Sequence, residues 1–277
     1  MRVYYCFPEG KYKALTMSYD DGVLADRRLV SIFNQHGIKA TFNLNYSSIV
    51  NPTPSAKRAR IAPEEVSTLY KGHEVATHTA HHPSIARCPL TYVADEILED
   101  RKGLEALAGY VVRGHAYPNG SYNKAIEELF HSLGIAYGRP TLCDDSLKLP
   151  VNPMDWRPTC HHSNPRLMEY AETLVNFEKS QYVRLMYVWG HSYEFDENDN
   201  WHVIEEFCKY IGNRPDIWYA TNIEIIDYMQ VIDRLQYNSD CTGVYNPSAQ
   251  SAWLNVRIEG RDVIVEAKGG EYTKFCK

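Results

Sequence analysis

The chain has 277 residues, of which 44% are hydrophobic and 23% are charged, as in an ordinary globular protein of one or two domains. Its net charge of -6 argues against nucleic acid or an anionic membrane surface as the main partner. Seven scattered cysteines without a C-x-x-C pair, no signal-peptide pattern and no membrane-length apolar run indicate a cytoplasmic protein with reduced thiols.

Strands and helices are expected to alternate along most of the chain. The predicted strands cover residues 14–19, 38–44, 73–77, 110–117, 135–137, 182–189 and 217–220. The predicted helices cover residues 24–36, 63–72, 91–108, 122–133, 164–177, 203–211 and 221–235. Residues 138–163 are predicted to form a long irregular connection. About seven βα units of this kind favour an α/β fold with a parallel barrel or a wound sheet.

The C-terminal segment breaks this alternation. Residues 253–258 and 263–267 read as a β-hairpin, which we expect to be a lid or a packing piece. The chain is therefore predicted to comprise one domain of alternating strands and helices over residues 1–235 and a β-rich extension over residues 236–277 that packs on it.

Two adjacent carboxylates, Asp20 and Asp21, follow the first βα strand directly, and Gly22 allows the chain to turn away. Catalytic groups of α/β proteins collect at this end of the strands. Because adjacent aspartates repel each other, one of them is expected to hold a cation. The alternative is a helix N-cap, since acidic residues favour helix starts.

A second polar cluster follows the strand over residues 73–77. His78 and His82 can face one cation if the segment turns helically, and His81 offers a second register. Two imidazoles and one carboxylate suit a catalytic divalent metal with an open position for water. Clustered histidines on a polar surface are the alternative interpretation.

Two short motifs resemble those of a known family. Residues 18–22 (S-Y-D-D-G) are similar to the T-F-D-D-G motif of the polysaccharide deacetylases of carbohydrate esterase family 4, and residues 78–82 (H-T-A-H-H) to its H-S/T-x-x-H motif. The resemblance runs from about residue 13 to residue 228 in motif order. It implies a distorted (β/α) barrel of about seven strands, here followed by the C-terminal β-hairpin extension.

Carried over by position, the resemblance implies a role for each matched residue. Asp20 becomes the general base and His191 the general acid, with Asp155 orienting that histidine. Asp21, His78 and His82 become the ligands of a divalent metal, with Zn2+ as the expected ion. The resemblance also implies substrate or oxyanion contacts, and these fall on Tyr117, Asn119 (through its backbone N–H), Trp156 and Trp189.

Two positions depart from the family pattern. Ala116 stands where the family has the arginine that steadies the catalytic base, and Trp189 replaces a leucine. Arg113 should lie on the opposite face of its strand, so Arg157 is the better candidate to replace the arginine. For His115, His161 and His162 we expect ordinary polar roles. Asp155 as a loop cap and His191 as a buried hydrogen-bonded histidine remain open alternatives.

The sequence thus predicts a metal-dependent hydrolase that removes N-acetyl groups from a sugar or an oligosaccharide. A hydrolase of another small C–N substrate, such as a cyclic amide or imide, is the nearest enzymatic alternative. A carbohydrate-binding protein with a decayed site is the alternative from another class, and Ala116 is the argument for it. The expected partner is an N-acetylated carbohydrate, without nucleic acid or membrane, and the oligomeric state is left open.

Overall fold

The computed structural model describes residues 1–53 and 58–275. Its central sheet is parallel, with the strand order β6-β5-β4-β3-β2-β8-β7, and β9 pairs beside the first half of β2. The strands of this sheet are β2 (Lys13–Asp20), β3 (Ala40–Leu44), β4 (Glu74–Thr77), β5 (Gly114–Ala116), β6 (Tyr137–Arg139), β7 (Cys160–His161), β8 (Arg184–Gly190) and β9 (Ile217–Tyr219).

The sheet curls but does not close, because β6 and β7 are not paired with each other in the described part of the chain. The connection after β6 spans the gap between them. The backbone N–H of Trp156 donates to Gly138 of β6, and that of Thr159 donates to Tyr187 of β8. The predicted distorted (β/α) barrel is therefore confirmed.

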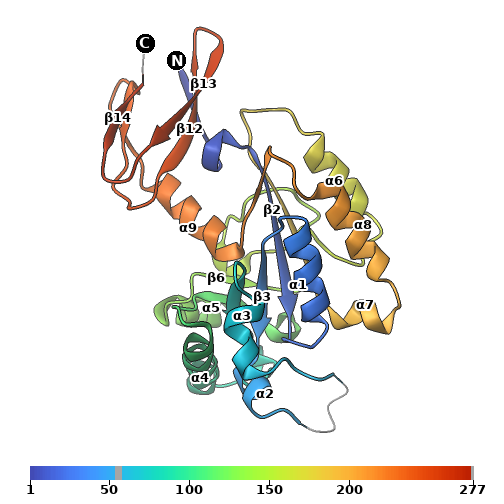
Figure 1. The fold of residues 1–277 in the computed structure, drawn as a ribbon. Coiled ribbons are helices and arrows are strands. Elements are labelled where there is room, and N and C mark those ends of the chain that lie inside the picture. Colours follow the sequence, from blue (N-terminus) through green and yellow to red (C-terminus); the bar gives the residue numbers. More distant parts are fainter. Residues whose placement is uncertain (54–57, 276–277) are drawn as a thin grey trace.

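Helices pack around the sheet (Figure 1). They are α1 (Asp26–Gln35), α2 (Tyr46–Val50), α3 (Val66–Leu69), α4 (Leu90–Ala108), α5 (Lys124–Ser132), α6 (Leu167–Val175), α7 (Tyr193–Glu197), α8 (Trp201–Ile211) and α9 (Asn222–Asp233). The capping box that opens α9 joins Thr221 and Glu224, as their spacing predicts. Neither α2 nor α7 was predicted. Among the described residues, no helix has the length and apolar character needed to cross a membrane.

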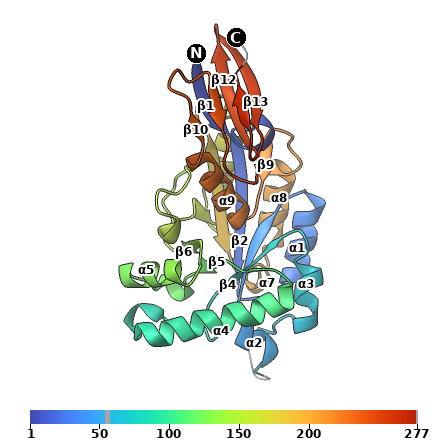
Figure 2. The ribbon, with the colours of Figure 1, turned by 90° about the vertical axis from the view of Figure 1, so that its left-hand side faces the viewer.

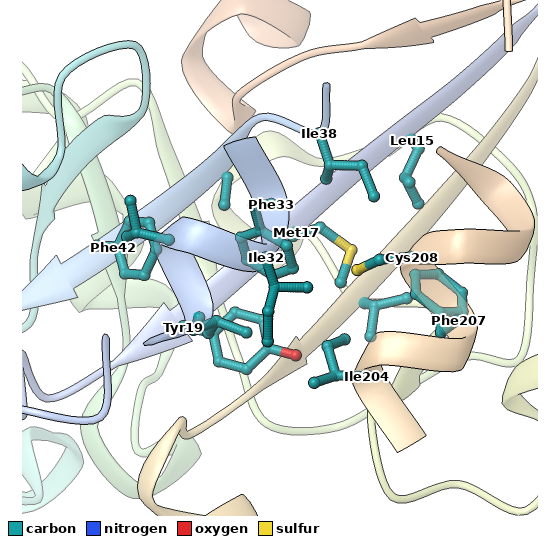
Figure 3. Packing of buried hydrophobic residues seen from close by; sticks show 14 of the residues in the cluster. Leu15, Met17, Tyr19, Ile32, Phe33, Ile38, Phe42, Ile204, Phe207 and Cys208 are labelled. Carbon is teal, nitrogen blue, oxygen red and sulfur yellow. The ribbon is translucent and has the colours of Figure 1, made fainter. Parts of the chain in front are cut away.

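The alternation of side chains along β2 positions the site. Leu15, Met17 and Tyr19 point outward and pack against α1 and α8, as Figure 3 shows. Since successive strand residues face opposite sides, Thr16, Ser18 and Asp20 point into the barrel. There Thr16 bonds to Asn222, and Ser18 to Asn43. The apolar outer face of β2 thus fixes the inward direction of the Asp20 carboxylate.

The C-terminal segment forms two small antiparallel sheets. The hairpin of β12 (Ala252–Ile258) and β13 (Arg261–Ala267) confirms the predicted hairpin, and the N-terminal strand β1 (Arg2–Cys6) pairs with its β12 edge. The second sheet contains β10 (Gln236–Tyr237), β11 (Gly243–Tyr245) and β14 (Tyr272–Lys274).

Both sheets of the extension lie at the end of the barrel where β2 begins (Figures 1 and 2). Asp20 is at the other end of β2, so the interpretation of the hairpin as a lid over the site is wrong. The packing contacts are specific: Tyr228 of α9 donates its hydroxyl to the carbonyl of Cys6 at 2.6 Å and accepts the N–H of Trp253 at 3.0 Å. The division of the chain at residue 235 stays a prediction.

Candidate active site

Asp20 lies at the centre of a polar cluster inside the barrel and is only 2% exposed. Its Oδ1 accepts hydrogen bonds from Asn43 at 2.8 Å and from the guanidinium of Arg139. Its Oδ2 lies 3.9 Å from Nε2 of both His78 and His191. Burial raises the pKa of Asp20, but Arg139 and the two histidines outweigh burial and lower it to about 2. Asp20 is thus an ionised carboxylate with one oxygen held and the other facing two imidazoles.

Asp21, His78 and His82 form the group that the sequence predicts as metal ligands. One ligand atom from each lies within 4.8 Å of the other two, and Nε2 of His82 is 4.0 Å from Oδ1 of Asp21. Burial, together with the neighbouring His82, lowers the pKa of His78 to about 4, so its imidazole is neutral and able to coordinate a metal. Its Nδ1 contacts the carbonyl of Ala116 at 2.7 Å, which directs Nε2 into the site.

The backbone that carries these ligands is unusual. Asp21, Thr79 and His82 all have positive φ values, of 84°, 61° and 59°. The loop after β4 is therefore not the single helical turn that the spacing of four suggests. Left-handed conformations in non-glycine residues cost roughly 1–3 kcal/mol each and persist where the surrounding structure enforces them. The donor set and its supporting contacts fit a divalent metal with an open position.

His81 does not join this group. Its Nδ1 contacts Glu96 at 3.0 Å, and its backbone N–H donates to the same carboxylate at 2.9 Å. The side chain is half exposed. Of the two registers considered for the histidine cluster, the structure brings together the one that contains His82.

The arginine beside Asp20 is Arg139, not Arg157. The Cα of Arg139 on β6 is the register partner of Ala116 on β5, so the guanidinium enters the barrel from the neighbouring strand at the same level. Arg139 is fully buried, whereas Arg157 forms an exposed bidentate pair with Asp155 at 2.9 and 3.0 Å. The expectation for Arg157 is wrong. Arg113 pairs with Asp227.

Glu194, not Asp155, is the carboxylate that contacts His191. Nδ1 of His191, two residues before α7, lies 3.3 Å from Oε1 of Glu194 in the first turn of that helix. Asp155 accepts hydrogen bonds from Tyr122 and Arg157 instead. Burial lowers the pKa of His191, but the contact with Glu194 and the charges of Asp20 and Asp21 outweigh burial, and the net shift is upward. The predicted orienting role of Asp155 is therefore corrected.

The predicted substrate contacts divide into two pairs. Trp189 lies beside the site, with the Arg139 guanidinium 4.7 Å from its ring centroid, and Asn119 lies in the turn after β5 with a positive φ of 55°. Tyr117 is fully buried, and its hydroxyl donates to the carbonyl of Met154, so its side chain does not face a substrate. Trp156 is 1% exposed and packs between the rings of Tyr137 and Tyr187.

The histidines without a predicted site role differ from one another. His115 is fully buried against Tyr117 and Phe130, and burial holds its pKa well below its usual value. His161 and His162 each place Nε2 3.1 Å from Oε2 of Glu194. Glu194 was missed at the sequence level, although its position three residues after His191 on a helical turn was an available signal.

Comparisons with known proteins agree with the motifs. The polysaccharide deacetylase family matches residues 7–138. A peptidoglycan-N-acetylglucosamine deacetylase of Listeria monocytogenes is 26% identical over 118 residues, which are 42% of this chain and 23% of the relative. A chitooligosaccharide deacetylase of a Bradyrhizobium species is 24% identical over 147 residues, 52% of this chain and 59% of the relative. The chain thus spans less than two thirds of either relative.

Solved structures share the fold at low sequence identity. A protein of Pseudomonas aeruginosa PAO1 assigned as a polysaccharide deacetylase superposes with a TM-score of 0.62 at 14% identity, covering 80% of this chain and 92% of the other. The Puue allantoinase gives a TM-score of 0.59 at 14% identity, covering 80% and 91%. The two motifs and the match over residues 7–138 agree, and both make this part of the chain similar to the polysaccharide deacetylase family.

Proposed function

We propose that the protein is a metal-dependent deacetylase that hydrolyses the acetamide group of an N-acetylated sugar or oligosaccharide. The observation that carries this proposal is the position of Asp20. Its free oxygen lies at 3.9 Å from both a neutral candidate metal ligand, His78, and a histidine of raised pKa, His191. A base between a metal site and an acid suits metal-assisted hydrolysis of an amide.

The proposed reaction divides the work among a metal site, a base, an arginine and a backbone donor. A divalent ion held by Asp21, His78 and His82 would supply Lewis acidity toward the acetamide group. Asp20 removes a proton from the attacking water as the water oxygen bonds to the carbonyl carbon. Arg139 keeps that carboxylate ionised and oriented. The backbone N–H of Asn119 is proposed to donate to the oxyanion.

His191 completes the reaction. As the C–N bond breaks, its Nε2 donates a proton to the departing nitrogen, and the products are acetate and a free amine. Glu194 holds Nδ1 of the same ring, so the proton-bearing Nε2 is directed toward Asp20 and the space before it. The ring thus delivers its proton on the side where the substrate nitrogen is proposed to lie.

A polar groove beside the metal ligands favours a carbohydrate. It has a volume of about 620 Å³ and is lined by hydroxyl, amide and guanidinium groups that include Ser47, Asn51, Arg58 and Arg60. Arg60 donates to the backbone carbonyl of Asp21, which joins the groove to the site. Sugar hydroxyls can exchange hydrogen bonds with these groups.

Acetate release tests the proposal. N-acetylglucosamine, its oligomers and a cyclic amide are incubated with zinc-loaded protein, and acetate and product masses are measured. We expect acetate from an N-acetylated sugar, at a rate that His82→Gln abolishes and that His202→Gln, a control at an exposed histidine of α8, leaves unchanged. Opening of the cyclic amide without acetate release would support the other hydrolase, and sugar binding without turnover would support a binding protein.

A further inference from the structure

A second group of metal-binding side chains lies behind the candidate acid. It consists of His161 at the end of β7, the adjacent His162, and Glu194 on α7. The proposed reaction assigns nothing to the two histidines, and it uses Glu194 only through Oε1. The Oε2 atom of Glu194 faces the other way, toward both imidazoles.

The distances fit ligands around a common ion. Nε2 of His161 and Nε2 of His162 each lie 3.1 Å from Oε2 of Glu194, yet among the described residues this oxygen has no hydrogen-bond partner. The ring nitrogens are thus close to the oxygen without pointing at it as hydrogen-bond donors do. Ligand atoms about 2.0–2.2 Å from one zinc ion lie roughly 3.1–3.5 Å apart, so the observed separations suit a shared ion.

The remaining ring atoms hold this arrangement in place. Nδ1 of His161 contacts the hydroxyl of Ser163 at 2.8 Å and accepts the backbone N–H of Ser163 at 3.2 Å, which holds the ring with Nε2 toward Glu194. His162 is 2% exposed and stacks on Phe195 with ring centroids 4.2 Å apart. Its buried Nδ1 has no hydrogen-bond partner among the described residues and lies against Gly190, where an added Cβ would be 2.0 Å from that nitrogen. A glycine at 190 therefore makes room for this imidazole.

We infer that His161, His162 and Glu194 form a second site for a divalent transition metal, with zinc as the matching ion. Two imidazoles and a carboxylate are nitrogen and oxygen ligands that suit zinc and leave a coordination position open. The ion would tie the end of β7 to α7 and fix the carboxylate that contacts His191. This site goes beyond the proposed deacetylation, because it shares no ligand with Asp21, His78 and His82.

Counting bound ions tests the inference without any assay of activity. Metal-free full-length protein is titrated with zinc by calorimetry, and the bound metal is measured after dialysis. We expect about two equivalents for the wild type and about one for His161→Gln, whose side chain is partly exposed and tolerates substitution. Exposed His202→Gln, the control for surface adsorption, should keep both equivalents.

Two further measurements locate the ions. An Asp21→Ala, His78→Ala double variant should keep about one equivalent, and adding Glu194→Gln to it should remove that one. Zinc should also raise the Tm of the double variant, and His161→Gln should abolish that rise. A wild-type stoichiometry of one, or a His161→Gln variant that still binds two ions, would overturn the second site, whether or not the protein deacetylates sugars.

Discussion

Replacing Arg139 should disable the proposed base. Arg139 is the largest of the charges that hold the pKa of Asp20 at about 2, against an ordinary value of 3.8, and the whole difference corresponds to ~2 kcal/mol in favour of the charged form. In Arg139→Met, burial of Asp20 is no longer opposed by a guanidinium, so its pKa rises and the carboxyl becomes protonated at higher pH. Leaving one partner of a buried ion pair alone costs roughly 3–5 kcal/mol of stability.

Activity and stability are measured together across pH. We expect Arg139→Met to lose activity by about 10²-fold near neutral pH, with partial recovery as the pH rises and Asp20 ionises again. Arg139→Lys should recover part of the loss, because it keeps the charge but not the planar geometry. Arg157→Met, which removes only an exposed pair with Asp155, should match the wild type. If Arg157→Met loses activity and Arg139→Met does not, Arg139 is not the arginine that keeps Asp20 ionised.

Two more outcomes follow from the same contacts. His191→Ala should lose roughly 10²-fold or more of its activity on an N-acetyl substrate but far less on an aryl acetate, because a phenolate leaves without being protonated. Asp20→Asn should lower the rates of both reactions similarly. Equal losses of activity on the two substrates for His191→Ala would exclude its role as the acid. Burial raises the pKa of Glu74 from 4.5 to about 7, so its contribution to stability is complete below pH 4.5 and is lost as the pH rises through 7. Over this pH range, the free energy of unfolding of the wild type should therefore fall by up to ~3 kcal/mol more than that of Glu74→Gln, as measured with denaturant. Parallel pH profiles of the unfolding free energy for the two proteins would contradict the raised pKa of Glu74.

The sequence was most informative where local pattern and chemistry coincide. Residues 14–19 form a short run without helix caps, and this predicted both the strand and the position of Asp20 and Asp21 at its end. The spacing of His78 and His82 led to the correct grouping, although the backbone between them is not helical. The side chains of this group follow two strands, and the end of each strand could be predicted from the residues next to it in the sequence.

The missed residues depend on register between strands. The predicted strand ended at residue 137, whereas β6 continues through Arg139, and only the pairing of Arg139 with Ala116 reveals that the arginine comes from the next strand. Glu194 was missed because α7 is too short for a periodic pattern. The position of the hairpin was missed for the same reason. It lies at the end of the barrel where β2 begins, because β1, which precedes β2, pairs with β12 of the hairpin.

A metal held by Asp21, His78 and His82 should be required for deacetylation. Zinc is added stepwise to metal-free His161→Gln protein, which isolates this site, and acetate release from an N-acetylglucosamine oligomer is measured at each step. We expect no release without metal, a rise that ends near one equivalent, and no release at any zinc concentration when Asp21→Ala is added. Undiminished acetate release from the metal-free protein, or from the Asp21→Ala variant, would contradict this requirement.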